Sequence, residues 1–239
     1  MSSARTLAAV LFDMDGTLID TEKLWDVALR ELAIRHGGTL SDSTRVAMIG
    51  ASVGTTMRLL SEDLGLPDMD RDEGAAWLLA RTGELFAEGI PWRPGAAELL
   101  AAVRAAGVPT ALVTNTGRRL TDLALCTIGA ANFDAVVCGD EVAYSKPHAE
   151  HYLAAARALG VEAGQCVAIE DSSTGLASAR AAGCVLLAIP NEIPLVGPDI
   201  AGVTVRASLL EVDVPLLHHL VATAGLARGV DVSGGRGQP

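Results

Sequence analysis

The sequence is poor in lysine and in positive charge overall. Lys23 and Lys146 are its two lysines, and 29 acidic residues outnumber 18 basic ones to give a formal net charge of −11. Nucleic acid and anionic membranes repel a chain with this charge. We therefore expect neither as a partner.

Long hydrophobic runs are also absent. No apolar run reaches the length of about 18 residues that a transmembrane helix needs, and residues 1–6 are too short and polar for a signal peptide. The cysteines lack CxxC spacing and lie in apolar runs, which favours buried free thiols in a reducing cytosol. We expect a cytoplasmic protein whose four thiols are Cys126, Cys138, Cys166 and Cys184.

The rest of the composition is that of an ordinary globular protein. Of 239 residues, 50% are hydrophobic and 20% are charged, which suits one large domain or one domain with a smaller insert. Short apolar runs bounded by Gly, Pro or Asp predict strands buried on both faces, as in a parallel sheet. These runs span residues 7–12, 109–113, 135–138, 166–169, 185–189 and 203–205.

Helical segments separate most of these runs. Pro94 and Gly107 bracket one, Pro147 and Gly160 bracket another, and Gly183 ends a third, as expected when Pro begins helices and Gly follows them. The alternation predicts a Rossmann-like, doubly wound α/β sheet with its functional groups at the carboxyl ends of the strands.

Residues 21–89 break this alternation because they show only helical periodicity. Apolar residues recur on one face from Leu24 to Leu32, and further helices are expected at 41–49, 55–64 and 71–88. We expect an inserted helical cap, residues 21–89, on an α/β core of residues 1–20 and 90–226. The hinges should lie near 20–22 and 89–93, and the Gly-rich end, 227–239, should be disordered.

The segment Asp13-Met14-Asp15-Gly16-Thr17 directly follows the first expected strand. Asp13 could present one oxygen as a nucleophile and the other to a metal, while Asp15 acts as general acid and then as base. Gly16 permits a sharp turn with positive φ. Taken alone, the segment favours this catalytic role, with an Asp-Gly turn of the common kind as the alternative.

Three further polar segments follow other expected strands. Thr114 and Asn115 offer a hydroxyl and an amide to phosphate oxygens, although Thr114 could instead be a plain helix cap. Lys146, beside a proline, could neutralise phosphate and carboxylate charge or be a solvated surface lysine. Glu170 and Asp171 are hard oxygen ligands suited to Mg²⁺ or a surface acidic pair. Because parallel strands end at one edge of a sheet, we expect all these groups in one site.

With these residues the chain resembles the haloacid dehalogenase superfamily, in its phosphatase branch with a helical cap after the first strand. The resemblance covers about residues 8–207 and rests on the segment 13–17, on Thr114, on Lys146 in Ser-Lys-Pro, and on the acidic segment 170–175.

The resemblance implies a role for each residue. Asp13 attacks phosphorus, Asp15 is the acid and base, and Thr114 and Lys146 hold the phosphoryl group. Mg²⁺ binds to Asp13, the backbone carbonyl of Asp15 and Asp171, with Glu170 either a ligand or a group behind the ligands. The expected reaction is hydrolysis of a small sugar, polyol or other metabolite phosphate, and the oligomeric state is open with a monomer favoured.

The alternative reaction is that of a β-phosphoglucomutase-like phosphosugar mutase. This branch is similar through Asp20-Thr21, but Trp25 and Val53 stand where it carries a histidine and an arginine. Dehalogenating members lack an aspartate two residues after the nucleophile, so Asp15 argues against carbon–halogen cleavage.

Several other side chains are expected to have structural roles. His148 and His151 should lie on an exposed helix face, and Arg93 should be exposed before a proline. Trp25 should pack inside the cap, with the floor of a substrate pocket as the alternative.

Overall fold

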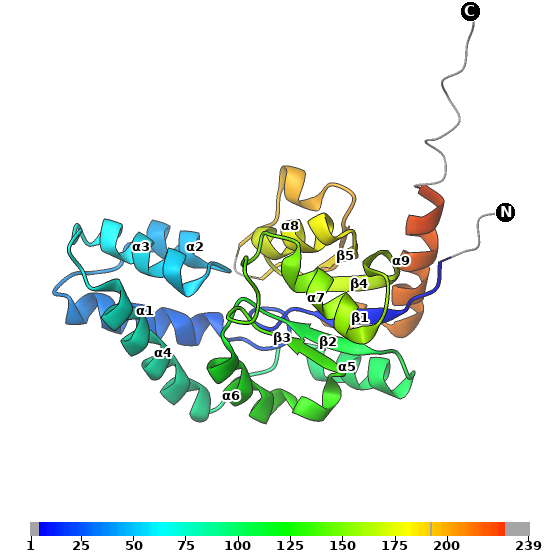
Figure 1. Cartoon of the computed structure of the whole chain (residues 1–239), viewed down its shortest axis with the longest axis horizontal. Coiled ribbons are helices and arrows are strands. Elements are labelled where there is room, and N and C mark those ends of the chain that lie inside the picture. The colour runs from blue at the N-terminus through cyan, green and yellow to red at the C-terminus, as the bar shows by residue number, and fades with distance from the viewer. Residues whose placement is uncertain (1–4, 192, 228–239) are drawn as a thin grey trace, which may run out of the picture.

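A parallel sheet forms the centre of the protein. The computed structural model describes residues 5–191 and 193–227, and in this part of the chain six strands lie in the order β3-β2-β1-β4-β5-β6, all parallel. Helices cover both faces of the sheet (Figure 1). The strands are β1 Ala9–Phe12, β2 Thr110–Val113, β3 Ala135–Val137, β4 Cys166–Glu170, β5 Val185–Ala188 and β6 Thr204–Val205.

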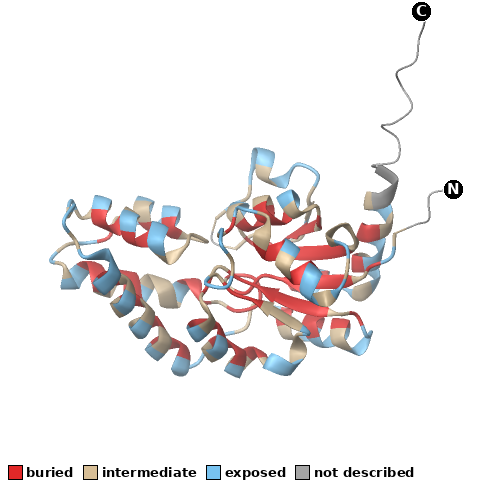
Figure 2. Ribbon diagram, in the orientation of Figure 1, coloured by how far each residue is buried: buried red, intermediate tan, exposed pale blue. Residues whose placement is uncertain are grey.

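Alternation of side chains explains the burial of the central strands. In β1, Val10 and Phe12 pack into the hydrophobic core on the side of α5, α6 and α9, whereas Ala9 and Leu11 pack on the side of α7 and α8. Both faces are apolar, so the strands are buried while the helices expose their outer faces (Figure 2). The covering helices are α5 Ala96–Ala105, α6 Arg118–Ile128, α7 Glu150–Leu159, α8 Ser173–Ala182 and α9 Val214–Ala227.

The strand order reverses beside β1. The chain proceeds from β1 to β2 and β3 on one side, then returns to β4 on the other side of β1. The connections that leave β1 and β4 therefore diverge and open a crevice at their carboxyl ends, which is where doubly wound sheets bind ligands. The predicted doubly wound, Rossmann-like α/β fold is confirmed.

The helices α1–α4, which follow β1 in the chain, lie on the left of Figure 1. Their apolar residues, among them Leu29, Leu32, Met57, Leu60 and Leu78, form a hydrophobic cluster separate from those of the sheet. The helices are α1 Glu22–Arg35, α2 Asp42–Met48, α3 Val53–Asp63 and α4 Arg71–Ala87. Ser41, Ser52 and Asp70 cap α2, α3 and α4 with their side chains, which is why these helices begin within two residues of the expected positions.

The two connections between this helical block and the sheet lie side by side. The Asp20 amide donates to the Pro91 carbonyl at 2.8 Å, and the Arg93 amide donates to the Leu18 carbonyl at 2.9 Å. Both segments fall at the expected hinge positions. A rotation of the helical block relative to the sheet would therefore pivot about these two hydrogen-bonded segments.

Some expectations were wrong in detail. The helix expected to begin at Pro147 begins at Glu150, because the preceding residues form a turn in which the His148 amide donates to the Ser145 carbonyl at 3.0 Å. Cys126 is exposed, unlike the other three free cysteines. In the expected disordered end, Ala227 is the last residue of α9 and residues 228–239 lie outside the described part.

Short 3-10 helices complete the described chain: η1 Ala130–Asn132, η2 Ala163–Gln165, η3 Gly197–Ile200 and η4 Leu209–Glu211. Among the described residues, no helix combines the length and the hydrophobicity that crossing a bilayer requires.

Candidate active site

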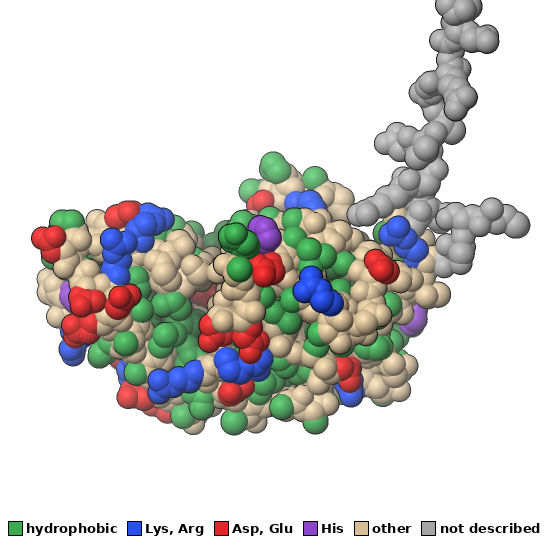
Figure 3. Space-filling view, viewed as in Figure 1, with side chains coloured by type: hydrophobic (Ala, Val, Ile, Leu, Met, Phe, Trp, Pro, Cys, Tyr) green, Lys and Arg blue, Asp and Glu red, His purple; other side chains and the backbone are tan. Residues whose placement is uncertain are grey.

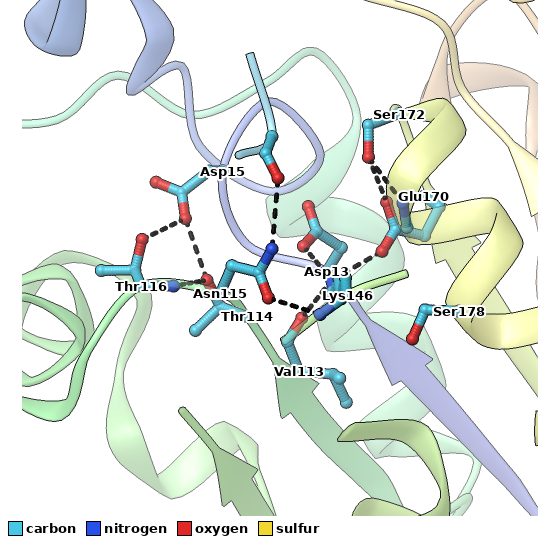
Figure 4. A network of polar contacts seen from close by, with 12 residues as sticks. Asp13, Asp15, Val113, Thr114, Asn115, Thr116, Lys146, Glu170, Ser172 and Ser178 are labelled. Atoms are coloured by element: carbon cyan, nitrogen blue, oxygen red, sulfur yellow. Dashed lines mark hydrogen bonds and ion pairs between the residues drawn. The ribbon is translucent and has the colours of Figure 1, made fainter. Parts of the chain in front are cut away.

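A buried lysine joins the ends of the central strands (Figure 4). Lys146 Nζ donates to Asp13 Oδ1 at 2.7 Å, to Glu170 Oε1 at 2.6 Å and to the Val113 carbonyl at 3.0 Å. The Lys146 side chain is 4% exposed and that of Glu170 is fully buried. One ammonium group thus ties together β1, β2 and β4 at their carboxyl ends.

The Glu170 carboxylate is held from both sides. Tyr152 on α7 donates its hydroxyl to Oε1 at 2.5 Å, and Ser172 donates to Oε2 at 3.2 Å. The ring of Tyr152 also lies 5.2 Å from Lys146 Nζ, within cation–π distance. These contacts fix the position of Glu170 and, through it, that of Lys146.

Negative charge exceeds positive charge in this cluster. Burial and then the nearby Glu170 raise the pKa of Asp13 to about 8, in opposition to Lys146. Burial, followed by Asp13 and Glu170, raises the pKa of Asp171 well above its usual value. Although burial alone would lower the pKa of Lys146, Asp13 and Glu170 raise it above its usual value. A second cation among these carboxylates would reverse the shifts of the two aspartates.

The arrangement of oxygens fits a divalent metal ion. Asp13, Glu170 and Asp171 each offer one ligand oxygen, and these atoms lie within 4.8 Å of one another. Gly16 has φ +78°, and a Cβ atom there would collide with the Asp171 carboxylate. The turn therefore requires glycine to let Asp171 approach the loop that carries Asp13. Carboxylate oxygens in this number suit Mg²⁺.

Three threonine hydroxyls hold the side chain of Asp15. Thr21 donates to Oδ1 at 2.7 Å, while Thr114 and Thr116 donate to Oδ2 at 3.0 and 2.8 Å. The Thr116 amide in turn donates to the Thr114 hydroxyl at 3.0 Å. Asp15 is thus positioned by the segment that follows β2 and by Thr21, which directly precedes α1, rather than by its own loop alone.

Asn115 joins the sheet to the helical block. Its Nδ2 donates to the Gly50 carbonyl at 3.1 Å, and its Oδ1 accepts from the Lys146 amide at 3.0 Å. Both ends of the amide are therefore engaged by backbone groups. The contact with Gly50, in the loop between α2 and α3, brings that loop over the carboxyl ends of the strands.

A cleft of about 730 Å³, including its open mouth, lies between α1–α4 and the charged cluster around Lys146. The molecular surface is indented where the helical block meets the rest of the molecule (Figure 3). Trp25 lines the cleft and also packs edge-on against Phe86, with ring centroids 6.5 Å apart. Its two expected roles, packing and pocket lining, are thus combined.

The structure brings all the sequence-predicted site residues to this cleft or directly behind it. Asp13, Asp15, Thr114, Asn115, Lys146 and Asp171 line it, and Glu170 lies behind Lys146.

Sequence reasoning missed Thr21, Thr116 and Tyr152. The Thr114-x-Thr116 spacing, which repeats that of the two aspartates, was a usable signal for Thr116. No such signal pointed to Tyr152, because this residue lies on an apolar helix face.

His151 was expected on an exposed face and is instead fully buried. It lies on α7, whose inner side packs on the sheet beside Tyr152. Burial and the nearby Lys146 lower the pKa of His151 to about 4, in opposition to the backbone carbonyls of Thr114 and Tyr144. The imidazole is therefore neutral at ordinary pH.

Comparison with known proteins agrees with this geometry. Residues 7–183 match the profile of the haloacid dehalogenase-like hydrolases. The chain belongs to this family. Hexitol phosphatase B of Escherichia coli (strain K12) is 31% identical over 192 residues, which are 80% of this chain and 86% of that protein. The expected hydrolase of the haloacid dehalogenase family is thus confirmed.

Solved structures extend the likeness to nearly the whole of this haloacid dehalogenase-like hydrolase. A CbbY variant from Rhodobacter sphaeroides, in complex with xylulose-(1,5)bisphosphate, is 28% identical with a TM-score of 0.75 and covers 86% of this chain and 96% of that one. β-Phosphoglucomutase from Clostridium difficile has a TM-score of 0.78 at 20% identity, over 91% and 98% of the chains. The latter likeness concerns the fold alone.

Proposed function

We propose that this protein is a Mg²⁺-dependent phosphatase that hydrolyses a small organic phosphate monoester through a phospho-aspartate on Asp13. The observation that carries the proposal is the ammonium group of Lys146, held 2.7 Å from Asp13 Oδ1 at the end of the central strand. Relatives named as phosphatases, including a hexitol phosphatase, support the class of substrate.

The residues on the two sides of Asp13 support its role as nucleophile. Lys146 fixes Asp13 Oδ1, so the carboxylate is held ready to attack phosphorus with little loss of rotational freedom. The ammonium group also lies where charge develops on the phosphoryl oxygens, which is the main form of stabilisation in phosphoryl transfer. Thr114 and Asn115 directly follow β2 and line the same cleft as Asp13 and Lys146.

Asp15 is the proposed proton carrier. It would donate a proton to the leaving oxygen and then take one from the attacking water. The hydroxyls of Thr21, Thr114 and Thr116 orient its carboxylate. A carboxylate positioned by three donors can act in both steps without moving far.

Asp13, Asp171 and the backbone carbonyl of Asp15 would hold Mg²⁺, which when bound supplies positive charge that offsets the charge of the phosphate. Both oxygens of Glu170 already accept hydrogen bonds, from Lys146 and Tyr152 on one side and Ser172 on the other. We therefore assign Glu170 a positioning role behind the metal site rather than a direct bond to the ion.

Residues 21–89 are the proposed cap, and residues 1–20 and 90–226 the proposed core. Closure of the cap would exclude water during phosphoryl transfer, and opening would release the product. The Asn115–Gly50 contact at 3.1 Å supports a closed arrangement of the two parts. The free cysteines support a cytoplasmic location.

The test is the hydrolysis of p-nitrophenyl phosphate by Asp13→Asn. We expect turnover to fall by roughly 10⁴-fold or more, as for other nucleophile deletions, with an unchanged circular dichroism spectrum. Asp122→Asn is the matched control, because Asp122 is 60% exposed on α6 and should retain normal turnover. Near-normal turnover in Asp13→Asn would remove Asp13 from the chemistry.

Two further assays test the need for Mg²⁺ and distinguish a phosphatase from a mutase. EDTA should abolish phosphate release and added Mg²⁺ should restore it, whereas activity in the chelated enzyme would exclude the metal from the reaction. With β-glucose 1-phosphate, a mutase would produce glucose 6-phosphate, and a phosphatase would produce free phosphate.

A further inference from the structure

The wall of the cleft that faces the charged cluster is largely apolar. It comes from α1, α2, α3 and α4 and from the loop between α2 and α3, all parts of the proposed cap. Its hydrophobic side chains are Trp25, Leu29, Met48, Ile49, Val53 and Leu78. Any group bonded to a phosphate at Asp13 and Lys146 must extend toward this wall, because the strands close the opposite side.

This wall contains a single ion-paired cluster. Arg45 Nη2 donates to Glu22 Oε2 and to the Glu22 carbonyl, each at 2.8 Å, and Arg45 Nε donates to Asp26 Oδ1 at 3.1 Å. Arg45 and Glu22 are each 6% exposed. Asp26 is shared with Arg30, whose Nε donates to its two carboxylate oxygens at 3.0 and 2.9 Å. The Glu22–Arg45 pair that lines the cleft therefore carries no net formal charge.

Every cation in the described lining of the cleft is already paired with acids. These cations are Arg45 in the cap wall and Lys146 in the opposite wall, where it binds Asp13 and Glu170. A second phosphate or a carboxylate on the substrate would therefore meet the Glu22 carboxylate without an uncommitted positive partner in this lining. Like charges brought together in a desolvated site oppose binding strongly.

We propose that the Glu22–Arg45–Asp26 cluster and the apolar wall select phosphate monoesters whose alcohol portion is uncharged, and that they reject esters with a second phosphate or a carboxylate. The inference rests on the proposed phosphatase function and specifies its substrate class. The preferred esters are monophosphates of polyols, neutral sugars or similar alcohols, whose carbon-bound hydrogens contact the apolar wall.

The test compares two esters that differ in one charged group. Sorbitol 6-phosphate and 6-phosphogluconate have the same carbon chain, but a carboxylate replaces one hydroxymethyl group in the second. We expect kcat/KM for phosphate release to be higher for sorbitol 6-phosphate by roughly tenfold or more. Glucose 6-phosphate should likewise exceed glucose 1,6-bisphosphate.

The outcomes distinguish this inference from the proposed function. If the enzyme hydrolyses p-nitrophenyl phosphate but treats the members of each pair equally, including equal absence of turnover, the inference is overturned and the phosphatase function stands. A preference for the charged esters overturns it as well. If no ester, p-nitrophenyl phosphate included, releases phosphate, both fail.

Two variants connect the selectivity with the cluster. Glu22→Gln keeps the shape of the side chain and removes one negative charge, so the preference for sorbitol 6-phosphate over 6-phosphogluconate should fall about tenfold. Val53→Arg adds a cation to the wall without touching the buried pair, and should reduce the preference in the same way. It therefore tests the inference even if Glu22→Gln folds poorly.

Ile34→Arg is the matched control for Val53→Arg. Ile34 is 70% exposed near the end of α1, so the same added charge there should leave the wild-type selectivity unchanged. Wild-type selectivity in both Glu22→Gln and Val53→Arg, or an equal change in Ile34→Arg, would overturn the inference.

Discussion

The two walls of the cleft carry their charges in different ways. In the wall formed by the strand ends, Asp13 and Glu170 pair with one lysine and Asp171 lies beside them, and the excess negative charge leaves room for a metal ion. In the wall formed by α1–α4, Arg45 is matched by Glu22 and Asp26 among apolar neighbours. The first wall is built to bind charge and the second to exclude it.

The difference also concerns how the residues are brought together. The carboxylates of the first wall lie at or directly after the ends of β1 and β4, so the sheet brings them together, and the turn before α7 adds Lys146. Glu22 and Arg45 lie 23 positions apart on separate helices, and only the packing of the helical block makes them partners. In our proposals, the chemistry therefore belongs to the sheet and the selectivity to α1–α4.

Among the substitutions that compare the two walls, the largest expected effect is that of removing Lys146. Lys146→Met leaves buried carboxylates unpaired, so we expect the free energy of unfolding to fall by about 3–5 kcal/mol. Turnover of p-nitrophenyl phosphate should fall by roughly 10²–10³-fold. Urea unfolding and steady-state kinetics measure the two losses.

Lys23→Met is the control for Lys146→Met, because Lys23 has a side chain that is 73% exposed in its pair with Asp20. Its free energy of unfolding should change by less than about 0.5 kcal/mol. Equal effects of the two substitutions would contradict a special role for the buried lysine.

Removing Arg45 should separate stability from catalysis. Arg45→Met removes the guanidinium group that binds the buried Glu22 carboxylate, and we expect a loss of about 3–5 kcal/mol in unfolding free energy. Turnover of p-nitrophenyl phosphate should fall by less than about tenfold, because Arg45 does not contact the reacting atoms. A catalytic loss as large as that of Lys146→Met would show that both walls share in the chemistry.

A smaller effect is expected from pH, through His151 behind the first wall. Its pKa is lowered to about 4 in the folded protein, so the unfolded chain binds the proton more readily between about pH 6.5 and 4. The stability contributed by neutral His151 is complete above pH 6.5 and is lost as the pH falls. Over this range, up to about 3 kcal/mol should disappear from the unfolding free energy.

His151→Leu measures this contribution by chemical denaturation at several pH values. The wild type should lose more stability than the variant between pH 6.5 and 4. Parallel pH curves for the two proteins would show that His151 is not buried as the structure places it.

Much of the first wall could be predicted from sequence because its residues are adjacent to strands. The apolar runs located every strand to within two residues, and the parallel sheet then placed Asp13, Thr114 and Glu170 at one edge. The start of α7 was misplaced by three residues because Pro147 belongs to the turn that carries Lys146.

The rest depended on packing that spacing does not determine. Tyr152 reaches Glu170 only because α7 lies across the sheet, and the same packing buries His151, which appeared polar enough for the surface. Cys126 is exposed because it falls on the outer side of α6. The pairing of Glu22 with Arg45 required the crossing of two helices and could not be read from either segment.

The central claim is that the first wall transfers a phosphoryl group to Asp13, and one measurement tests it directly. An Asp15→Ala variant, slowed in the release of phosphate, is mixed with Mg²⁺ and p-nitrophenyl phosphate, quenched in acid and reduced with borohydride, which converts an aspartyl phosphate into homoserine. Peptide mass spectrometry should find this conversion at position 13, dependent on both Mg²⁺ and substrate. Conversion at another carboxylate, or none at position 13 while phosphate is still released, would contradict the account.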